Sequence, residues 1–141
     1  MGKYFTTQEL TYSTTAKKYG INNTPTPEVK EHIEELIEVL DGIREKWGSA
    51  IIVSSGYRCP ELNAKLGGVK TSGHLTGYAV DMVPANNHKT KFFEFMKEYL
   101  KDKNIEFDEL LLERNTKSTW IHFALYGMQG KQRKKIKTLE A

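Results

Sequence analysis

Cysteine is nearly absent from this sequence, which has a single thiol, Cys59, among its 141 residues. One cysteine forms no intramolecular disulfide and excludes a metal site built from several thiolates. Because Cys59 precedes Pro60 at an expected helix start, we expect it to pack or to cap that helix rather than to act as a nucleophile. A metal site in this chain would therefore use histidine and carboxylate ligands.

Long apolar runs are absent as well. No stretch approaches the roughly 18 apolar residues that indicate a membrane span, and the first residues lack the apolar segment of a signal peptide. We therefore expect synthesis in the cytoplasm and no insertion into a membrane. With 38% apolar and 28% charged residues, the composition is typical of one globular domain that buries a real core.

Most of the chain has no excess of either charge. The net charge of +3 is concentrated in the last eleven residues, without which 16 basic and 17 acidic residues remain. The basic residues of this segment are Lys131, Arg133, Lys134, Lys135 and Lys137. A nearly neutral body argues against a nucleic-acid-binding protein, which carries a basic face on the fold itself. We expect one domain over residues 1–128 and a basic tail over 129–141, either a solvated terminus or a loose tether to an anionic polymer.

The spacing of apolar residues predicts both helices and strands. Thr6 and Glu9 form a capping-box pattern that predicts a short helix, and one apolar stripe predicts a core helix from Pro27 to Trp47, ended by Gly48. Further segments are expected as strands at 50–55 and 78–83, helices at 60–66 and 90–100, and a hairpin of strands 107–113 and 120–126. This irregular mixture predicts the α+β class, with a small antiparallel sheet and flanking helices.

Three polar residues occur in segments where their presence needs an explanation. His74 lies in a Gly-flanked loop, Asp81 in an otherwise apolar strand, and His122 between Ile121 and Phe123. Taken singly, each is explained by a salt bridge or a hydrogen bond, since a buried charge needs a partner. Their occurrence together favours one shared site. Two imidazoles and a carboxylate suit a Zn²⁺ ion whose fourth position stays open, as in catalytic zinc sites.

Three segments then carry a resemblance to a known family: SSGYRCPELN at 54–63, SGHLTGYAVD at 72–81 and WIH at 120–122. Together they resemble the M15 family of zinc D-Ala-D-Ala carboxypeptidases and related peptidoglycan endopeptidases, in the compact form common in phages and prophages. The likeness covers about residues 5 to 126. It implies an α+β fold similar to the signalling domain of hedgehog proteins.

The resemblance also implies roles for particular residues. It makes His74, Asp81 and His122 the ligands of one zinc ion. It matches Arg58 to an arginine that binds substrate and stabilises negative charge in the transition state. It matches Ser72 to a residue that contacts the substrate.

The sequence departs from several M15 branches at the general base. There an acid lies three residues before the last zinc histidine, where this chain has Thr119, which cannot act as a base. The nearest acid is Glu113, and the compact phage branch carries an acid at this place. If Glu113 lies opposite Trp120 in the hairpin, it faces the same side as His122. A register slipped by one would turn it away, as a solvated hairpin residue.

Pattern and resemblance together predict a zinc metallopeptidase that hydrolyses amide bonds in peptidoglycan stem peptides or cross-links. The bond remains open between a terminal D-Ala-D-Ala bond, a D,D cross-link and the L-Ala-D-Glu bond. We expect a monomer that acts on the cell wall after release from the cytoplasm, as a phage or prophage endolysin does, without a nucleic-acid partner. Thr119 keeps a second hypothesis open, a non-catalytic zinc-containing module that binds the cell wall.

Overall fold

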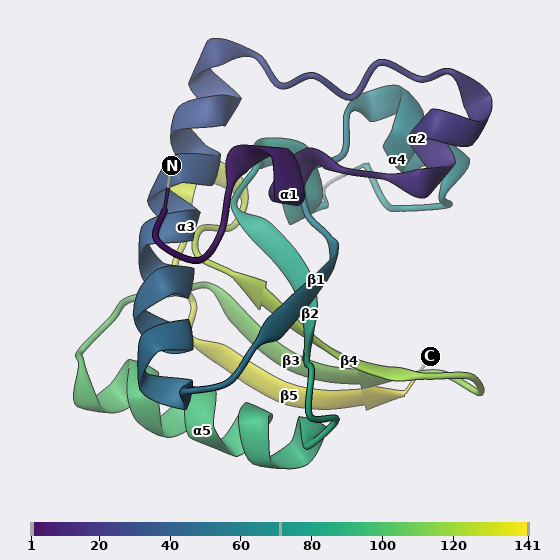
Figure 1. Cartoon of the computed structure of the whole chain (residues 1–141). Coiled ribbons are helices and arrows are strands. Elements are labelled where there is room, and N and C mark those ends of the chain that lie inside the picture. The colour runs from purple at the N-terminus through teal and green to yellow at the C-terminus, as the bar shows by residue number, and fades with distance from the viewer. Residues whose placement is uncertain (1, 71, 141) are drawn as a thin grey trace.

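The structure is a computed structural model that describes residues 2–70 and 72–140 (Figure 1). The α-helices are α1 (Thr7–Thr11), α2 (Thr14–Tyr19), α3 (Pro27–Trp47), α4 (Pro60–Lys65) and α5 (Lys89–Asp102). The strands are β1 (Ile51–Ser55), β2 (Ala79–Pro84), β3 (Glu109–Arg114), β4 (Thr119–Ala124) and β5 (Lys135–Glu140). Two short 3₁₀ helices, η1 (Gly73–Thr76) and η2 (Met128–Gly130), complete the described elements.

The strands form one sheet in the order β1-β2-β4-β3-β5. Neighbours are antiparallel except β3 and β5, which are parallel. The long helix α3 and the helix α5 lie on one side of this sheet, and α1, α2 and α4 gather near its end (Figure 1). This arrangement confirms the α+β class and the flanking helices that the sequence predicts.

The two faces of the sheet differ in character because successive side chains alternate between them. One face packs against α3 and α5 in a single apolar core. Its central strand residues, all fully or nearly fully buried, are Val80, Met82, Leu110, Leu112, Ile121 and Phe123. The alternate positions therefore present Asp81, Glu109, Glu113 and His122 on the opposite face.

Local signals account for the ends of the main helices. Thr26 caps α3 by accepting from Val29 N, and Gly48 ends it in the left-handed conformation at φ 78°. Cys59 caps α4, its Sγ accepting from Leu62 N at 3.5 Å, which confirms its expected capping role. In the part of the chain described, no helix combines the length and the apolar character that crossing a membrane would require.

Contacts with α3 hold the chain around η1 in place. The His32 ring of α3 stacks on Tyr78 with centroids 4.3 Å apart, and its Nδ1 lies 2.9 Å from the Thr76 carbonyl oxygen. Gly77 turns the chain from η1 into β2 at φ 83°, a conformation that favours glycine. A Cβ at Gly77 would also lie 3.0 Å from Val29 Cγ1. The turn is therefore pinned between the long helix and the sheet.

The end of the chain corrects the expectation of a solvated tail. Residues 135–140 form β5, the edge strand beside β3, with Lys135 opposite Glu109. Two basic residues just before this strand pair with acids near β3: Arg133 Nε lies 2.8 Å from Asp108 Oδ1, and Lys134 Nζ lies 2.6 Å from Glu106. In the sequence alone, this basic segment resembles a solvated terminus, because its acidic partners lie far away along the chain.

Candidate metal centre

His74 lies in η1, with 4% of the residue exposed. The hydroxyl of Ser72 caps η1 by accepting from His74 N at 3.2 Å, and the Arg58 N–H donates to the His74 carbonyl at 3.0 Å. The side-chain Nδ1 lies 2.7 Å from the Gly56 carbonyl oxygen. Since a carbonyl only accepts, Nδ1 carries a proton, and Nε2, which faces Asp81, is the nitrogen available to a metal ion. The loop expected at His74 is therefore corrected to a short 3₁₀ helix, and hydrogen bonds hold His74 from several sides.

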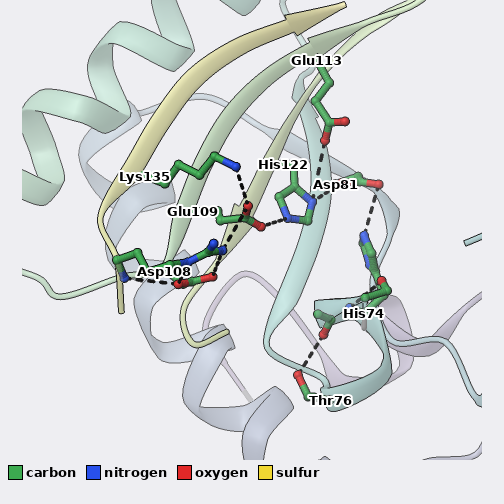
Figure 2. Close-up of polar contacts among 11 residues, drawn as sticks. His74, Thr76, Asp81, Asp108, Glu109, Glu113, His122 and Lys135 are labelled. Atoms are coloured by element: carbon green, nitrogen blue, oxygen red, sulfur yellow. Dashed lines mark hydrogen bonds and ion pairs between the residues drawn. The ribbon is translucent and has the colours of Figure 1, made fainter. Parts of the chain in front are cut away.

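Asp81 lies directly opposite His122 in the β2–β4 register, so the two side chains share a face. Its Oδ1 lies 2.9 Å from His122 Nδ1, and its Oδ2 lies 3.4 Å from His74 Nε2 (Figure 2). A bulge between Val53 and Ser55 shifts the register of β1 beside this position. One carboxylate thus connects two histidines that are distant in the sequence.

The electrostatic environment reflects these contacts. Burial opposes ionisation of Asp81, but hydrogen bonds from His122 and His74 hold its pKa well below the ordinary value. Burial likewise disfavours the charged form of His122, yet hydrogen bonds to Asp81 and Glu109 raise its pKa to about 10. Burial raises the pKa of Glu113, and the neighbouring Asp81 charge adds to this effect. The carboxylates of Asp81, Glu109 and Glu113 thus surround the His122 ring.

The donor set fits a single zinc ion. One ligand atom from each of His74, Asp81 and His122 can be chosen so that all lie within 4.8 Å of one another. Two imidazoles and one carboxylate are ligands that Zn²⁺ accepts in catalytic sites. The ring nitrogen of each histidine that faces away from Asp81 meets an acceptor, the Gly56 carbonyl for His74 and the Glu109 carboxylate for His122. Such partners orient histidine ligands in metal sites. The three residues that the sequence suggested therefore do meet.

Glu113 lies on the same face of the sheet as His122. It is opposite Trp120 in the β3–β4 register, which confirms the pairing expected for this hairpin. Its Oε1 lies 3.9 Å from His122 Nδ1, and 25% of its side chain is exposed. Figure 2 shows the carboxylate directed toward the histidine and Asp81. Its role as general base remains a prediction.

Glu109 is a site residue that sequence reasoning missed. Its Oε1 lies 3.4 Å from His122 Nε2. The hydrogen bond with His122 lowers the pKa of Glu109, and the charge of Arg133 lowers it further. Alternation along β3 was the available signal, because Glu109, Leu111 and Glu113 share one face. Placing Glu113 beside His122 thus also placed Glu109 on that side.

The side chains of Arg58 and Ser72 border the cluster and bond to residues other than its ligand atoms. The Arg58 guanidinium donates to Ser55 Oγ at 3.2 Å and to Asn63 Oδ1 at 3.4 Å. The Arg58 backbone N–H and the Ser72 hydroxyl support η1, as described above for His74. Their predicted contacts with substrate remain predictions.

A cavity of about 420 Å³ opens beside the cluster. Gly73, which precedes His74, and Ala124, two residues after His122, lie in its wall together with Glu109. Arg133 borders it from the segment that leads into β5. The cavity therefore adjoins Glu109 and residues next to the ligands, while the three ligand residues themselves do not line it.

A family model described as Peptidase M15 matches residues 3–124. A search of the curated proteins found no match. Because the model covers most of the chain, and its range includes the three ligand candidates and Glu113, the protein belongs to the peptidase M15 family.

Proposed function

We propose that this protein is a zinc-dependent peptidase that hydrolyses amide bonds in the stem peptides or cross-links of peptidoglycan. The carrying observation is the convergence of His74, Asp81 and His122 within 4.8 Å. Membership in the M15 family supports peptidase chemistry, and the resemblance described above supports the peptidoglycan substrate. The role would be cell-wall lysis by a monomer, in a phage or prophage context.

The three ligands would hold one Zn²⁺, which when bound acts as a Lewis acid that lowers the pKa of a water molecule and polarises a carbonyl. Glu113 is suited to receive a proton beside this position, because it is part-buried and lies 3.9 Å from His122 Nδ1. It would return that proton to the amine that leaves. Thr119 does not replace it, since a hydroxyl is not a base near neutral pH.

Substrate binding would use the residues around the cluster. The cavity lined by Gly73, Glu109 and Ala124 would accept part of the peptide. Arg58 would bind a negatively charged group of the substrate from the loop between β1 and α4, and Ser72 would contact the peptide from the cap of η1. Masses of the released products would identify which bond is cut.

The test is to incubate zinc-loaded protein with purified cell walls and measure new free amino groups. We expect release by the wild type, loss on adding a chelator, and a loss of about 10²- to 10⁴-fold in turnover for Glu113→Gln. Glu98→Gln, which removes the same charge from an exposed position on α5, serves as the matched control.

Two outcomes would contradict the proposal or part of it. Full activity of Glu113→Gln would remove Glu113 from the mechanism. Zinc-dependent binding to the walls without any new amino groups would overturn the peptidase function and favour a binding module.

A further inference from the structure

Glu109 connects the C-terminal segment with the metal centre. One carboxylate oxygen, Oε1, lies 3.4 Å from His122 Nε2. The other, Oε2, lies 3.3 Å from Arg133 Nη2 and 3.8 Å from Lys135 Nζ. Figure 2 shows Glu109 between His122 on one side and Lys135 on the other. The carboxylate is therefore held by cations through one oxygen while the other meets the ring.

Arg133 is itself held in a fixed position. Its Nε and Nη2 lie 2.8 and 2.9 Å from the two carboxylate oxygens of Asp108, a residue that is 1% exposed. The backbone of Gly127 packs against this carboxylate so closely that a Cβ there would lie 2.5 Å from Oδ2. A planar guanidinium that forks onto a buried carboxylate is a rigid support. Arg133, held by the Asp108 carboxylate, can thus orient the carboxylate of Glu109 as well.

We propose that Glu109 is a positioning residue that holds the His122 ring through Nε2, and that Arg133 holds Glu109. The inference rests on the proposed zinc centre and extends it. Because Nε2 donates to Glu109, Nδ1, which faces Asp81 where the ligand atoms converge, is the nitrogen left to bind zinc. The family match ends at residue 124, so Arg133 supplies this support from beyond the matched region.

The contacts distinguish Glu109 from Glu113. Both acids share a face of β3, but Glu109 is engaged by two cations and by the ring nitrogen that points away from Asp81. Glu113 lies near the other ring nitrogen, Nδ1, at 3.9 Å, and no Lys or Arg pairs with it within the described residues. One carboxylate is thus restrained, and the other is left for proton transfer.

The first test compares Glu109→Ala with Glu109→Gln by measuring zinc affinity in competition with a chromophoric chelator. Both variants remove the same charge, but glutamine keeps an oxygen that accepts from Nε2. We expect Glu109→Ala to weaken zinc binding by about 10- to 100-fold relative to the wild type. Glu109→Gln should restore most of this loss. In ¹⁵N spectra of the zinc-loaded protein, the His122 proton should remain on Nε2 in the wild type and in Glu109→Gln.

The second test asks whether Arg133 acts through Glu109. Arg133→Lys keeps the charge but not the fork, so we expect weaker zinc binding in the wild-type background and no further loss in the Glu109→Ala background. Lys134→Arg is the matched control, because it also replaces one cation by another, but its partner is Glu106, whereas the acids that pair with His122 are Asp81, Glu109 and Glu113. Its zinc affinity should equal that of the wild type.

Each result has a definite meaning. Equal zinc affinities of Glu109→Ala and Glu109→Gln would overturn the positioning role. An equal effect of Arg133→Lys in both backgrounds would overturn the link through Glu109. Failure of the wild type to bind zinc would instead overturn the proposed function, so the two failures are distinguishable.

Discussion

At the scale of single residues, the metal centre depends on which ring nitrogen of each histidine carries a proton. For His74 the decision is made by the Gly56 carbonyl, 2.7 Å from Nδ1. For His122 it is made by Glu109, on the nitrogen opposite Asp81. The other nitrogen of each ring faces the Asp81 carboxylate and is the one available to a zinc ion. A zinc ligand set of two neutral imidazoles requires this arrangement of protons.

Gly56 should therefore tolerate no side chain. A Cβ at this position would lie 2.2 Å from the Leu10 carbonyl oxygen, so the backbone would have to move and would carry the Gly56 carbonyl with it. We expect Gly56→Ala to destabilise the fold by about 1–3 kcal/mol and to weaken zinc binding as well. Urea denaturation and chelator competition measure the two effects. Wild-type values for both would show that the loop adjusts without cost.

At the scale of elements, β5 is joined to the sheet by charge as well as by backbone pairing. The exposed apolar residues of β5, Ile136 and Leu139, contribute little to the core. The principal polar contact is that of Arg133 with Asp108, just before the two paired strands begin. Hydrogen bonding by Arg133 lowers the pKa of Asp108, although its burial acts in the opposite direction. The attachment of β5 should consequently depend on pH.

The sign of this dependence follows from proton binding. Because the pKa of Asp108 is lower in the folded protein than its ordinary value of about 3.9, the unfolded chain binds more protons in this range. The stabilisation is present above about pH 4 and is lost as the pH falls through the lowered pKa. We expect Arg133→Gln to cost about 1–3 kcal/mol at pH 7 and less at pH 3, measured by urea denaturation at both values.

The control for this comparison is Lys134→Gln. Its partner Glu106 is exposed, so the loss should be about 0–1 kcal/mol. If Arg133→Gln were no more destabilising than Lys134→Gln, or if its effect were the same at pH 3 and pH 7, the Asp108 pair would not be what secures the segment.

At the scale of the whole molecule, the three ligand candidates come from η1, β2 and β4. Segments that are far apart in the sequence would be joined by an ion bound to all three. A ligand that binds only the folded chain stabilises it by an amount that grows with its free concentration. The metal should therefore act on the stability of the entire domain as well as on its chemistry.

Zinc should accordingly raise the melting temperature. At a free concentration 100-fold above Kd, the gain is about 2.7 kcal/mol, which calorimetry would record as an increase of several degrees. His122→Ala should abolish the increase, whereas His88→Ala, at an exposed position before α5, should retain it. An increase of equal size in His122→Ala would place the bound zinc elsewhere.

The sequence by itself determined the features that depend on neighbours along the chain. The bounds of α3 follow from Pro27, a continuous apolar stripe and Gly48, because helix formation is a matter of residues a few positions apart. His74, Asp81 and His122 stood out because polar groups on apolar segments require partners. The register that places Glu113 beside His122 could also be predicted, since a hairpin pairs residues that are close in the sequence.

Only the tertiary structure decided the contacts between distant segments. The acidic partners of Arg133 and Lys134 lie on and before β3, so no local pattern distinguished a paired strand from a solvated tail. The order of strands also decided the contacts of Glu109, whose two oxygens face a histidine on β4 and cations in and before β5. Side chains in a folded protein respond to the charges that surround them in space, and these are brought together by packing rather than by sequence spacing.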